Sequence, residues 1–446
     1  MSEIVVDTIS GKSGGPVSFP NGITFGKSAF SAVNNIGVAG AQAFGVGICP
    51  NLPAGYVTMS GTTDPASDNY GNYQYSDGSV MVWVPAFFYK VGNGTNGLAV
   101  NQISIQPFAA YKDVPTANAA GYALHRAFYD AGAIQEGFFI DKYKCSNNGG
   151  IASSIRNGLP LSSAATHNPF SGLTGAPVNA LYGAIQAAQT RGAKFFPGSV
   201  FIRAALALLS LAHAQASTSS AWCAWYDSTG VTNFPKGCNN NALGDANDST
   251  ITYVWDGCAG NNSPKTGSAN FFSRTTHNGQ NCGIADLNGG MWEISLGLAV
   301  DSGGADFYVL NTTATMHLLT GGNTVATDAW GAAGLAANYT SLGATYGALT
   351  DSSSLKTIGS ATQVLSEATS GLAWEATGAG IPLVGGVGGS NAFGLDGLWD
   401  YRPADMSPIS GGGWSDGSAA GVWALNLSNT RAGSGTNVGF RAASYL

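Results

Sequence analysis

The strongest hydrophobic pattern in the chain is the run VFIRAALALLSLAHAQA after Ser199, which is apolar on nearly every side of a helix. A helix without a polar face belongs in the interior, so this run predicts a buried central helix with Ser199 as its N-cap. Two stretches rich in aromatic and β-branched residues, MVWVPAFFYKV (81–91) and EGFFIDKYKCS (136–146), predict strands.

Three further segments show weaker helical spacing. Val178, Leu181 and later apolar residues recur every three or four positions, which predicts a helix that Asn179 caps and Gly192 ends. The segment 116–132 has a helical spacing as well. In the long low-charge stretch that follows residue 320, a helix is predicted near 361–373.

The first 50 residues have a different pattern. Short β-branched stretches at 4–6, 17–19 and 23–25 are separated by Gly, Pro and Asn-Gly turn signals. Strands this thin cannot form a core alone, so they need partner chains. We therefore predict an N-terminal β-rich attachment and oligomerisation arm over residues 1–50, similar in style to the arms of phage tail fibres and favouring a homotrimer. One domain over residues 51–446 follows it.

Composition narrows the class of protein. The 446 residues include 64 Gly, 10 Trp, 17 Tyr and 20 Phe, and only 10% are charged, which indicates a folded, loop-rich chain. A net charge of −7 without a basic cluster argues against nucleic-acid binding. The most apolar run, 204–212, is too short to span a bilayer, and the opening lacks the apolar core of a secretory signal. We therefore expect synthesis in the host cytoplasm and no membrane insertion.

The six cysteines contain no Cys-x-x-C pair, which removes the usual zinc and redox motifs. Because nothing signals export, buried free thiols are favoured over disulfides, although an even number of cysteines permits disulfides.

Five segments resemble, in order and approximate spacing, a series in the formylglycine-generating-enzyme branch of the C-type lectin fold. They are GFFIDKYKCSN, APVNALYGAIQAAQTRGAKFFPGSVFIRAAL, GIADLNGGMWEI, ISGGGW and NVGFRAA, within residues 136–446. The resemblance implies a C-type lectin-like α+β domain with long loop inserts, with Trp414 and Phe440 in the core and Arg441 in a buried ion pair. The sequence departs from the family pattern at Arg203, at Gly290, and at either Ser410 or Gly411, where the family has other residues.

Catalysis of the family's kind is not expected. The two copper-binding thiolates of the family align with Asp416 and Gly421, and no Cys follows Cys282. The five His residues show no i, i+4 spacing and lie outside the C-terminal motifs, unlike the three-histidine iron enzymes of the superfamily. We predict that the chain is not an enzyme and requires no cofactor; a copper or iron oxidase of this superfamily is the alternative.

The C-terminus is similar to the variable proteins of diversity-generating retroelements, a family that includes phage tropism determinants. In that family the C-terminal side chains form an exposed patch on a rigid frame. Trp and Tyr suit such a patch because they give contact area at low entropy cost, and Ser, Asn and Gly adapt their hydrogen bonds. The resemblance implies a ligand-binding region over residues 396–446. The candidate contact residues are Trp399, Asp400, Tyr401, Arg402, Ser415, Asp416, Trp423, Asn426, Ser428, Asn429 and Thr430.

Two alternatives exist for Trp423. Alternation along GVWALNLSN places Trp423 with Leu425 and Leu427 on one face, and Asn426 with Ser428 on the other. The leucines belong in the core, which buries Trp423 as well; a β-bulge would instead expose it.

The resemblance also implies a structural calcium site. Its ligands would be Asp286, the carbonyls of Gly289 and Met291, and Glu293, all oxygen donors that suit a hard cation. The alternative is that Glu293 forms a structural ion pair.

These observations favour a phage tail fibre or receptor-binding protein, located in the virion. Its expected partners are a host-cell surface receptor, protein or glycan, and other tail proteins bound through the arm. A retroelement-diversified cellular surface binder is a further alternative.

Overall fold

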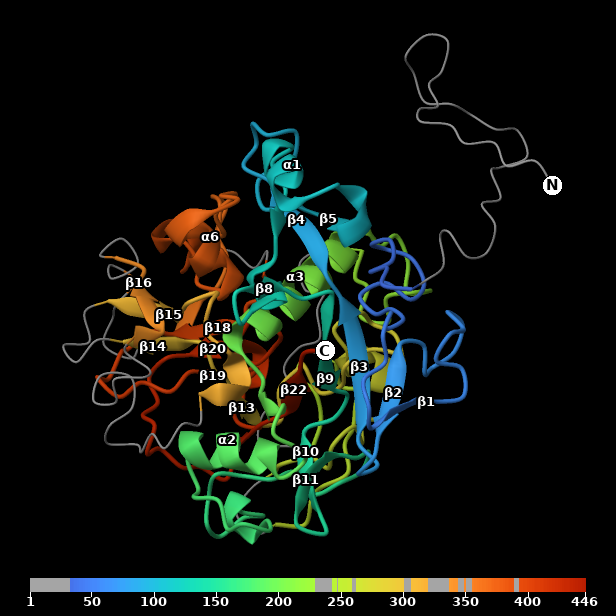
Figure 1. The fold of residues 1–446 in the computed structure, drawn as a ribbon, viewed down its shortest axis with the longest axis vertical. Helices are drawn as coiled ribbons and strands as arrows, with labels where there is room; N and C mark the ends of the chain where they lie inside the picture. Colours follow the sequence, from blue (N-terminus) through green and yellow to red (C-terminus); the bar gives the residue numbers. More distant parts are fainter. Residues whose placement is uncertain are drawn as a thin grey trace.

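The computed structural model describes residues 33–228, 243–246, 248–258, 262–300, 306–319, 337–343, 349, 355–388 and 393–446. This part of the chain has an α+β architecture, as predicted, in which two six-stranded sheets lie on either side of a central helix, α3 (Val200–Ala216) (Figure 1). The strands predicted at 4–6, 17–19 and 23–25 lie outside the described residues.

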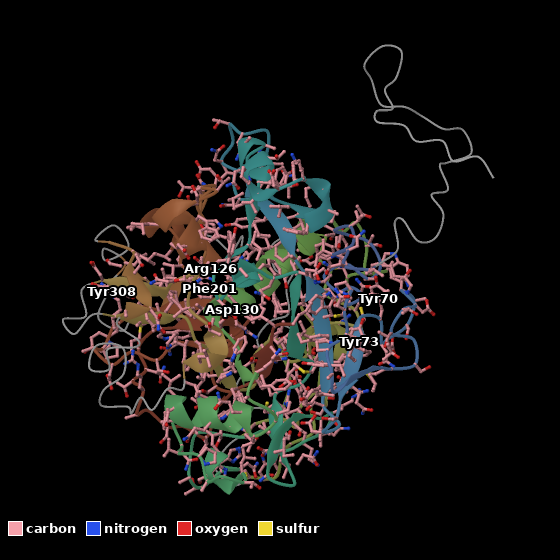
Figure 2. All side chains as sticks on the ribbon, in the orientation of Figure 1. Tyr70, Tyr73, Arg126, Asp130, Phe201 and Tyr308 are labelled. Carbon is pink, nitrogen blue, oxygen red and sulfur yellow. The ribbon has the colours of Figure 1, made fainter. Side chains whose placement is uncertain are left out.

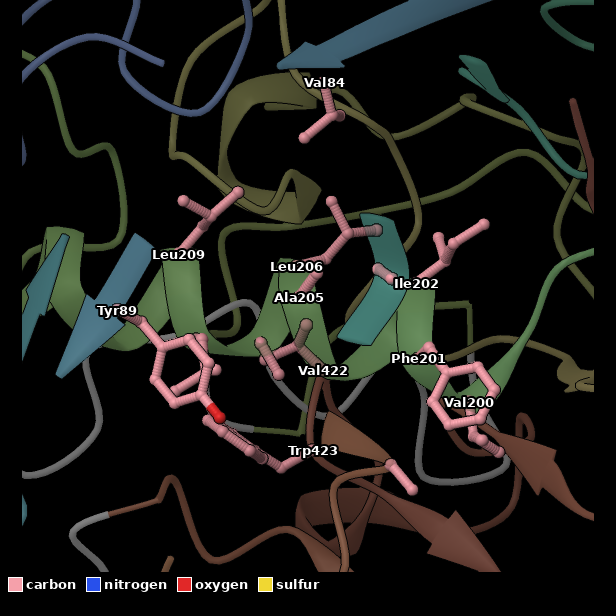
Figure 3. Packing of buried hydrophobic residues seen from close by; sticks show 14 of the residues in the cluster. Val84, Tyr89, Val200, Phe201, Ile202, Ala205, Leu206, Leu209, Val422 and Trp423 are labelled. Atoms are coloured by element: carbon pink, nitrogen blue, oxygen red, sulfur yellow. The ribbon is translucent and has the colours of Figure 1, made fainter. Parts of the chain in front are cut away.

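The central helix forms as its sequence predicts. The side-chain oxygen of Ser199 accepts a hydrogen bond from the backbone N–H of Ile202, so Ser199 is the N-cap. All residues of α3 except the last two are buried. Figure 3 shows Ile202 pointing towards Val84, while Val422 and Trp423 lie on the opposite side of the helix. Among the described residues, no helix combines the length and the apolar character needed to cross a membrane.

The first sheet joins two distant parts of the chain. Its strands, in spatial order, are β1 (Tyr56–Thr58), β2 (Asn72–Tyr75), β3 (Val80–Pro85), β9 (Gly137–Asp141), β22 (Ala442–Ser444) and β12 (Phe196–Pro197). The C-terminal strand β22 pairs antiparallel with β9, with Ala443 opposite Ile140. The first and last motif segments of the sequence are therefore neighbours.

The second sheet brings the remaining C-terminal motifs together. Its strands, in spatial order, are β17 (Lys356–Thr357), β18 (Gly397–Trp399), β20 (Leu425–Asn426), β19 (Ile409–Ser410), β13 (Trp292–Ile294) and β21 (Val438–Gly439). Strand β13 lies between β19 and β21, with Glu293 opposite Ser410 on one side and Gly439 on the other.

In the part of the chain that the structure describes, smaller sheets and three further helices surround these elements. The sheets are β5 (Ile103–Pro107), β4 (Phe87–Val91) and β6 (Ala123–Leu124); β14 (Leu298–Val300), β15 (Phe307–Leu310) and β16 (Tyr339–Ser341); β10 (Cys145–Asn148) and β11 (Ile151–Ser154); and β7 (Tyr129–Asp130) and β8 (Ala133–Ile134). The helices are α1 (Val114–Ala119), α2 (Leu181–Gln189) and α6 (Gly371–Gly378). The strands predicted at 81–91 and 136–146 are confirmed, each divided into two.

The helix predicted over 116–132 is mostly absent. Helix α1 ends before Gly121, whose φ of +79° favours glycine and breaks the helix. Leu124 then pairs with Phe88 across β6 and β4. The helical spacing of apolar residues continues past Gly121, but Ala123 and Leu124 pair with strand β4 and do not extend the helix.

The other two predicted helices are shifted. Helix α2 starts after Ala180, and Asn179 accepts a hydrogen bond from the backbone of Ser171, so Asn179 is not its cap. Helix α6 begins near the end of the predicted 361–373 span. The side chain of Asn101 bonds to the backbone of residues 360, 362 and 364, which holds that segment out of a helix.

Residues 33–50 of the predicted arm belong to the domain. Ile36, Phe44 and Val46 are fully buried, and the ring of Phe44 stacks on His213 of α3 with ring centroids 5.3 Å apart. The predicted boundary at residue 50 is therefore too late, because sequence alone did not show that these short apolar stretches contact α3. Cys49, Cys145, Cys223, Cys258 and Cys282 are free thiols, as predicted, and Cys238 lies outside the described residues.

Helix α6 is tied to the centre of the molecule by a buried arginine. Nε of Arg126 lies 2.9 Å from a carboxylate oxygen of Glu375 in α6. Its guanidinium lies 4.2 Å from the ring centroid of Phe201, which Figure 2 labels close by. Arg126 thus joins α6 to α3 through an ion pair and a cation–π contact.

Candidate functional site

The motif segments meet at Glu293, where four buried charged side chains converge. Arg441 forms two hydrogen bonds with the Glu293 carboxylate, at 2.7 and 2.9 Å, and Arg203 and Lys144 lie 3.4 and 3.6 Å from it. The predicted buried pair of Arg441 is confirmed. Burial by itself would raise the pKa of Glu293, but Arg441, Arg203 and Lys144 outweigh this and lower it to about 2.

Arg203 and Gly411, at two of the positions where the sequence departs from the motif series, are neighbours in space. A Cβ atom at Gly411 would lie 2.7 Å from a guanidinium nitrogen of Arg203. Gly411 also has a φ of +97°, which favours glycine. The absence of a side chain at Gly411, which directly follows β19, therefore leaves room for the guanidinium of Arg203 from α3. Sequence reasoning found each change separately and missed both this relation and the role of Lys144.

The residues predicted to hold calcium do not fit that ion. The Lys144 ammonium donates hydrogen bonds to the backbone carbonyl oxygens of Asp286 and Gly289, both at 2.9 Å, so a cation that bound the Gly289 carbonyl would lie next to Lys144. Glu293 is already paired with three cationic side chains. Met291, two residues before Glu293, is buried. A divalent ion would have to enter next to three positive charges, which is unfavourable.

We therefore expect millimolar calcium to leave the melting temperature of the protein unchanged. Lys144 already bonds to the Gly289 carbonyl, and the positive charges around Glu293 repel a divalent ion, so we expect calcium to bind the folded state no better than the unfolded chain. Thermal denaturation with calcium, and with equal magnesium as the control, measures this. A rise caused by calcium alone would contradict the structure.

Three of the predicted contact residues are buried. Asp400 accepts a hydrogen bond from Lys356 at 2.7 Å, and the guanidinium of Arg402 lies 4.6 Å from the ring centroid of Phe307. Trp423 is 4% exposed, which agrees with the alternative that buries it. These three predictions need correction, because side chains from other segments cover them. Sequence showed a polar and aromatic loop but not what packs on it.

The other predicted contact residues remain at the surface, and we call them the C-terminal loop surface. Tyr401 and Ser415 are exposed, and the rest are half-buried. Its members are Trp399, Tyr401, Ser415, Asp416, Asn426, Ser428, Asn429 and Thr430.

The second sheet fixes this surface in two neighbouring parts. Trp399 is opposite Asn426 across β18 and β20, and the backbone N–H of Ser407 donates to the carbonyl of Asn429. In the other part, Asp416 accepts a hydrogen bond from the backbone of Gly413 at 2.6 Å. Trp292 links the parts, because it bonds to Asp416 and packs edge-on against Trp399, with ring centroids 5.4 Å apart.

The frame below this surface is only partly as predicted. Phe440 is fully buried, as expected, but Trp414 is half-buried rather than a core residue. The ring nitrogen of Trp414 is itself buried without a hydrogen-bond partner. Burial raises the pKa of Asp416, and the hydrogen bonds from Gly413 and Trp292 oppose this.

A hollow lined by residues outside the C-terminal loop surface is a separate candidate site. It has a volume of about 400 Å³, and its lining includes Asp68, Asn69, Arg156, Asn270 and Phe271. Phe271 is an exposed ring beside these polar side chains. An aromatic surface with a few polar groups is a common form of small-ligand site, and sequence reasoning did not single it out.

Comparisons with known proteins identify no family. No protein-family model matches the sequence, and no curated protein matches it significantly. Among solved structures, the U1, P3c and I1 variants of the Major Tropism Determinant are 12%, 13% and 11% identical to this chain, with TM-scores of 0.30, 0.30 and 0.28. The U1 match covers 89% of this chain and 73% of that one, the P3c match the same shares, and the I1 match 85% and 84%. TM-scores of this size do not by themselves establish a common fold.

Proposed function

We propose that this chain is a receptor-binding protein of a phage tail. Its domain is of the C-type lectin-like, formylglycine-generating-enzyme type, and it binds a host-cell receptor, protein or glycan, through the C-terminal loop surface. Residues at the N-terminus attach the chain to other tail proteins as a homotrimer within the virion. Several weak sites on one particle then bind with avidity.

One observation carries this proposal. Motif segments far apart in sequence converge on the Glu293 cluster, and the loops between them are held by the sheet while their Tyr, Asn, Ser and Thr side chains reach the surface. A rigid frame with exposed aromatic and small polar side chains suits recognition, because little entropy is lost on binding.

The catalytic alternative has less support. The sequence has no Cys after Cys282, so the positions of the family's copper thiolates, Asp416 and Gly421, offer no thiolate pair. Oxygen consumption with a thiol peptide as substrate tests this directly. Sustained turnover would refute the proposed binding function.

We expect the double variant Tyr401→Ala/Thr430→Ala to reduce adsorption to host cells at least about 10-fold, because truncating a tyrosine that acts as a binding hot spot costs about 2 kcal/mol or more. Both side chains lie outside the core, so the melting temperature stays close to that of the parent. Binding of the purified full chain to host cells measures the effect.

Phe271→Ala is the matched control, because it removes an exposed aromatic side chain from the hollow that lies outside the C-terminal loop surface. We expect it to leave adsorption unchanged. Loss of adsorption in Phe271→Ala alone would place the receptor site in that hollow, and unchanged adsorption in the double variant would refute the C-terminal loop surface.

A further inference from the structure

A histidine, an aspartate and a cysteine converge outside the C-terminal loop surface. Potential ligand atoms of His167, Asp256 and Cys258 all lie within 4.8 Å of one another. His167 and Asp256 are buried, whereas Cys258 is half-buried. Nothing in the proposed receptor binding uses these groups.

The contact between His167 and Asp256 differs from an ordinary hydrogen bond. Nε2 of His167 lies 3.0 Å from Oδ2 of Asp256, yet Oδ2 accepts no hydrogen bond of normal geometry although it is buried. Two ligands of one tetrahedral zinc ion, each about 2.0–2.1 Å from it, are about 3.3 Å apart. The observed separation is thus close to that of two atoms that bind one ion.

The local backbone aims Asp256 and Cys258 at the same point. Oδ1 of Asp256 accepts a hydrogen bond from the backbone N–H of Cys258 at 2.9 Å, which leaves Oδ2 free of the turn. Gly257 between them has a φ of +89°, so the chain reverses sharply and brings both side chains together.

The loop that carries His167 is fixed independently. Ser162, where the loop begins, bonds to its other end: the Ser162 hydroxyl donates to the carbonyl of His167, and the Ser162 backbone N–H donates to the carbonyl of Asn168 at 2.8 Å. The next residue, Ser163, bonds to the backbone of Val438 and Gly435. An ion here would tie the 256–258 turn to a loop that supports the C-terminal segment.

We propose that His167, Asp256 and Cys258 form a binding site for one divalent metal ion of borderline softness, for which zinc fits best. Imidazole nitrogen, carboxylate oxygen and thiolate sulfur are the three ligand types that zinc uses in proteins, and water fills a fourth position. Binding forms one bond to each side chain and releases the thiol proton to solvent.

The test uses the purified full chain, stripped of metal and then incubated with zinc or with cobalt. We expect one zinc per chain after gel filtration and, with cobalt, a thiolate-to-metal charge-transfer absorption. Cys258→Ser should abolish this absorption and weaken zinc binding at least about 100-fold, the upper end of what loss of an outer-shell partner costs. His167→Gln should also weaken zinc binding.

Cys49→Ala is the control, because it removes a buried free thiol outside the cluster and should leave metal binding unchanged. Melting temperatures of the metal-free variants separate loss of the site from loss of folding. Absence of stoichiometric metal, or equal zinc binding by Cys258→Ser, would overturn the proposal and leave a His–Asp ion pair.

Discussion

Replacing Arg441 by Met is expected to lower the free energy of unfolding by about 3–5 kcal/mol, because removal of one partner leaves a buried charge without its main compensation. Arg441 forms both close hydrogen bonds to Glu293 and also donates to the carbonyls of Asp141, Lys142 and Ala285. The substitution therefore leaves several buried acceptors unsatisfied where the two sheets meet.

Urea denaturation measures this effect, with Arg274→Met as the matched control. Arg274 forms an ion pair with Asp248 that is partly exposed, so its loss should cost no more than about 1 kcal/mol. Arg441→Lys keeps the positive charge but not the paired geometry, and we expect an intermediate loss. Similar stabilities for Arg441→Met and Arg274→Met would contradict the structural role of the cluster.

The stability of the protein is expected to fall steeply as the pH drops below 6.5. Burial lowers the pKa of His125 and His277 to about 3 and that of His213 to about 4. Nδ1 of His213 and Nδ1 of His277 accept backbone hydrogen bonds from Gly40 and Ile284, which protonation would break. All three side chains are thus held neutral in the folded state.

The sign follows from proton uptake. An unfolded histidine takes up a proton near pH 6.5 and the folded one does not, so stability is present above pH 6.5 and is lost as the pH falls towards 4 and 3. Three protons correspond to a loss of up to about 4 kcal/mol per pH unit. Glu293 adds to this only below pH 4.5, as the pH falls towards about 2.

Denaturation at several pH values between 7 and 5 tests this slope. His277→Gln should make it shallower by about 1.4 kcal/mol per pH unit, which corresponds to one proton fewer. A stability that stays constant across this range would show that the histidines become charged within the folded protein.

Local patterns predicted correctly those elements whose burial in the fold follows directly from their own hydrophobic pattern. The run after Ser199 is apolar all round, so every arrangement that buries it uses it as a central helix. The segment 116–132 shows the limit: its spacing is helical, but Gly121 ends the helix and Leu124 joins a strand. Spacing cannot show which partner a segment meets.

The candidate site divides in the same way. Alternation indicated that Trp423 packs with the leucines, and that alternative is correct. Nothing local distinguishes Tyr401, which is exposed, from Asp400 and Arg402, which are covered by Lys356 and Phe307. The covering residues come from other parts of the chain.

The sequence by itself determined a buried central helix, because that depends on residue type and local spacing. The resemblance of its motifs implied the α+β class and the buried ion pair of Arg441. Only the tertiary structure decided that Lys144 bonds to the Gly289 carbonyl beside Glu293 and that His167 meets Asp256 and Cys258. The physical reason is that charge pairing and metal ligation act over a few ångströms in space, between residues whose separation along the chain carries no signal of their contact.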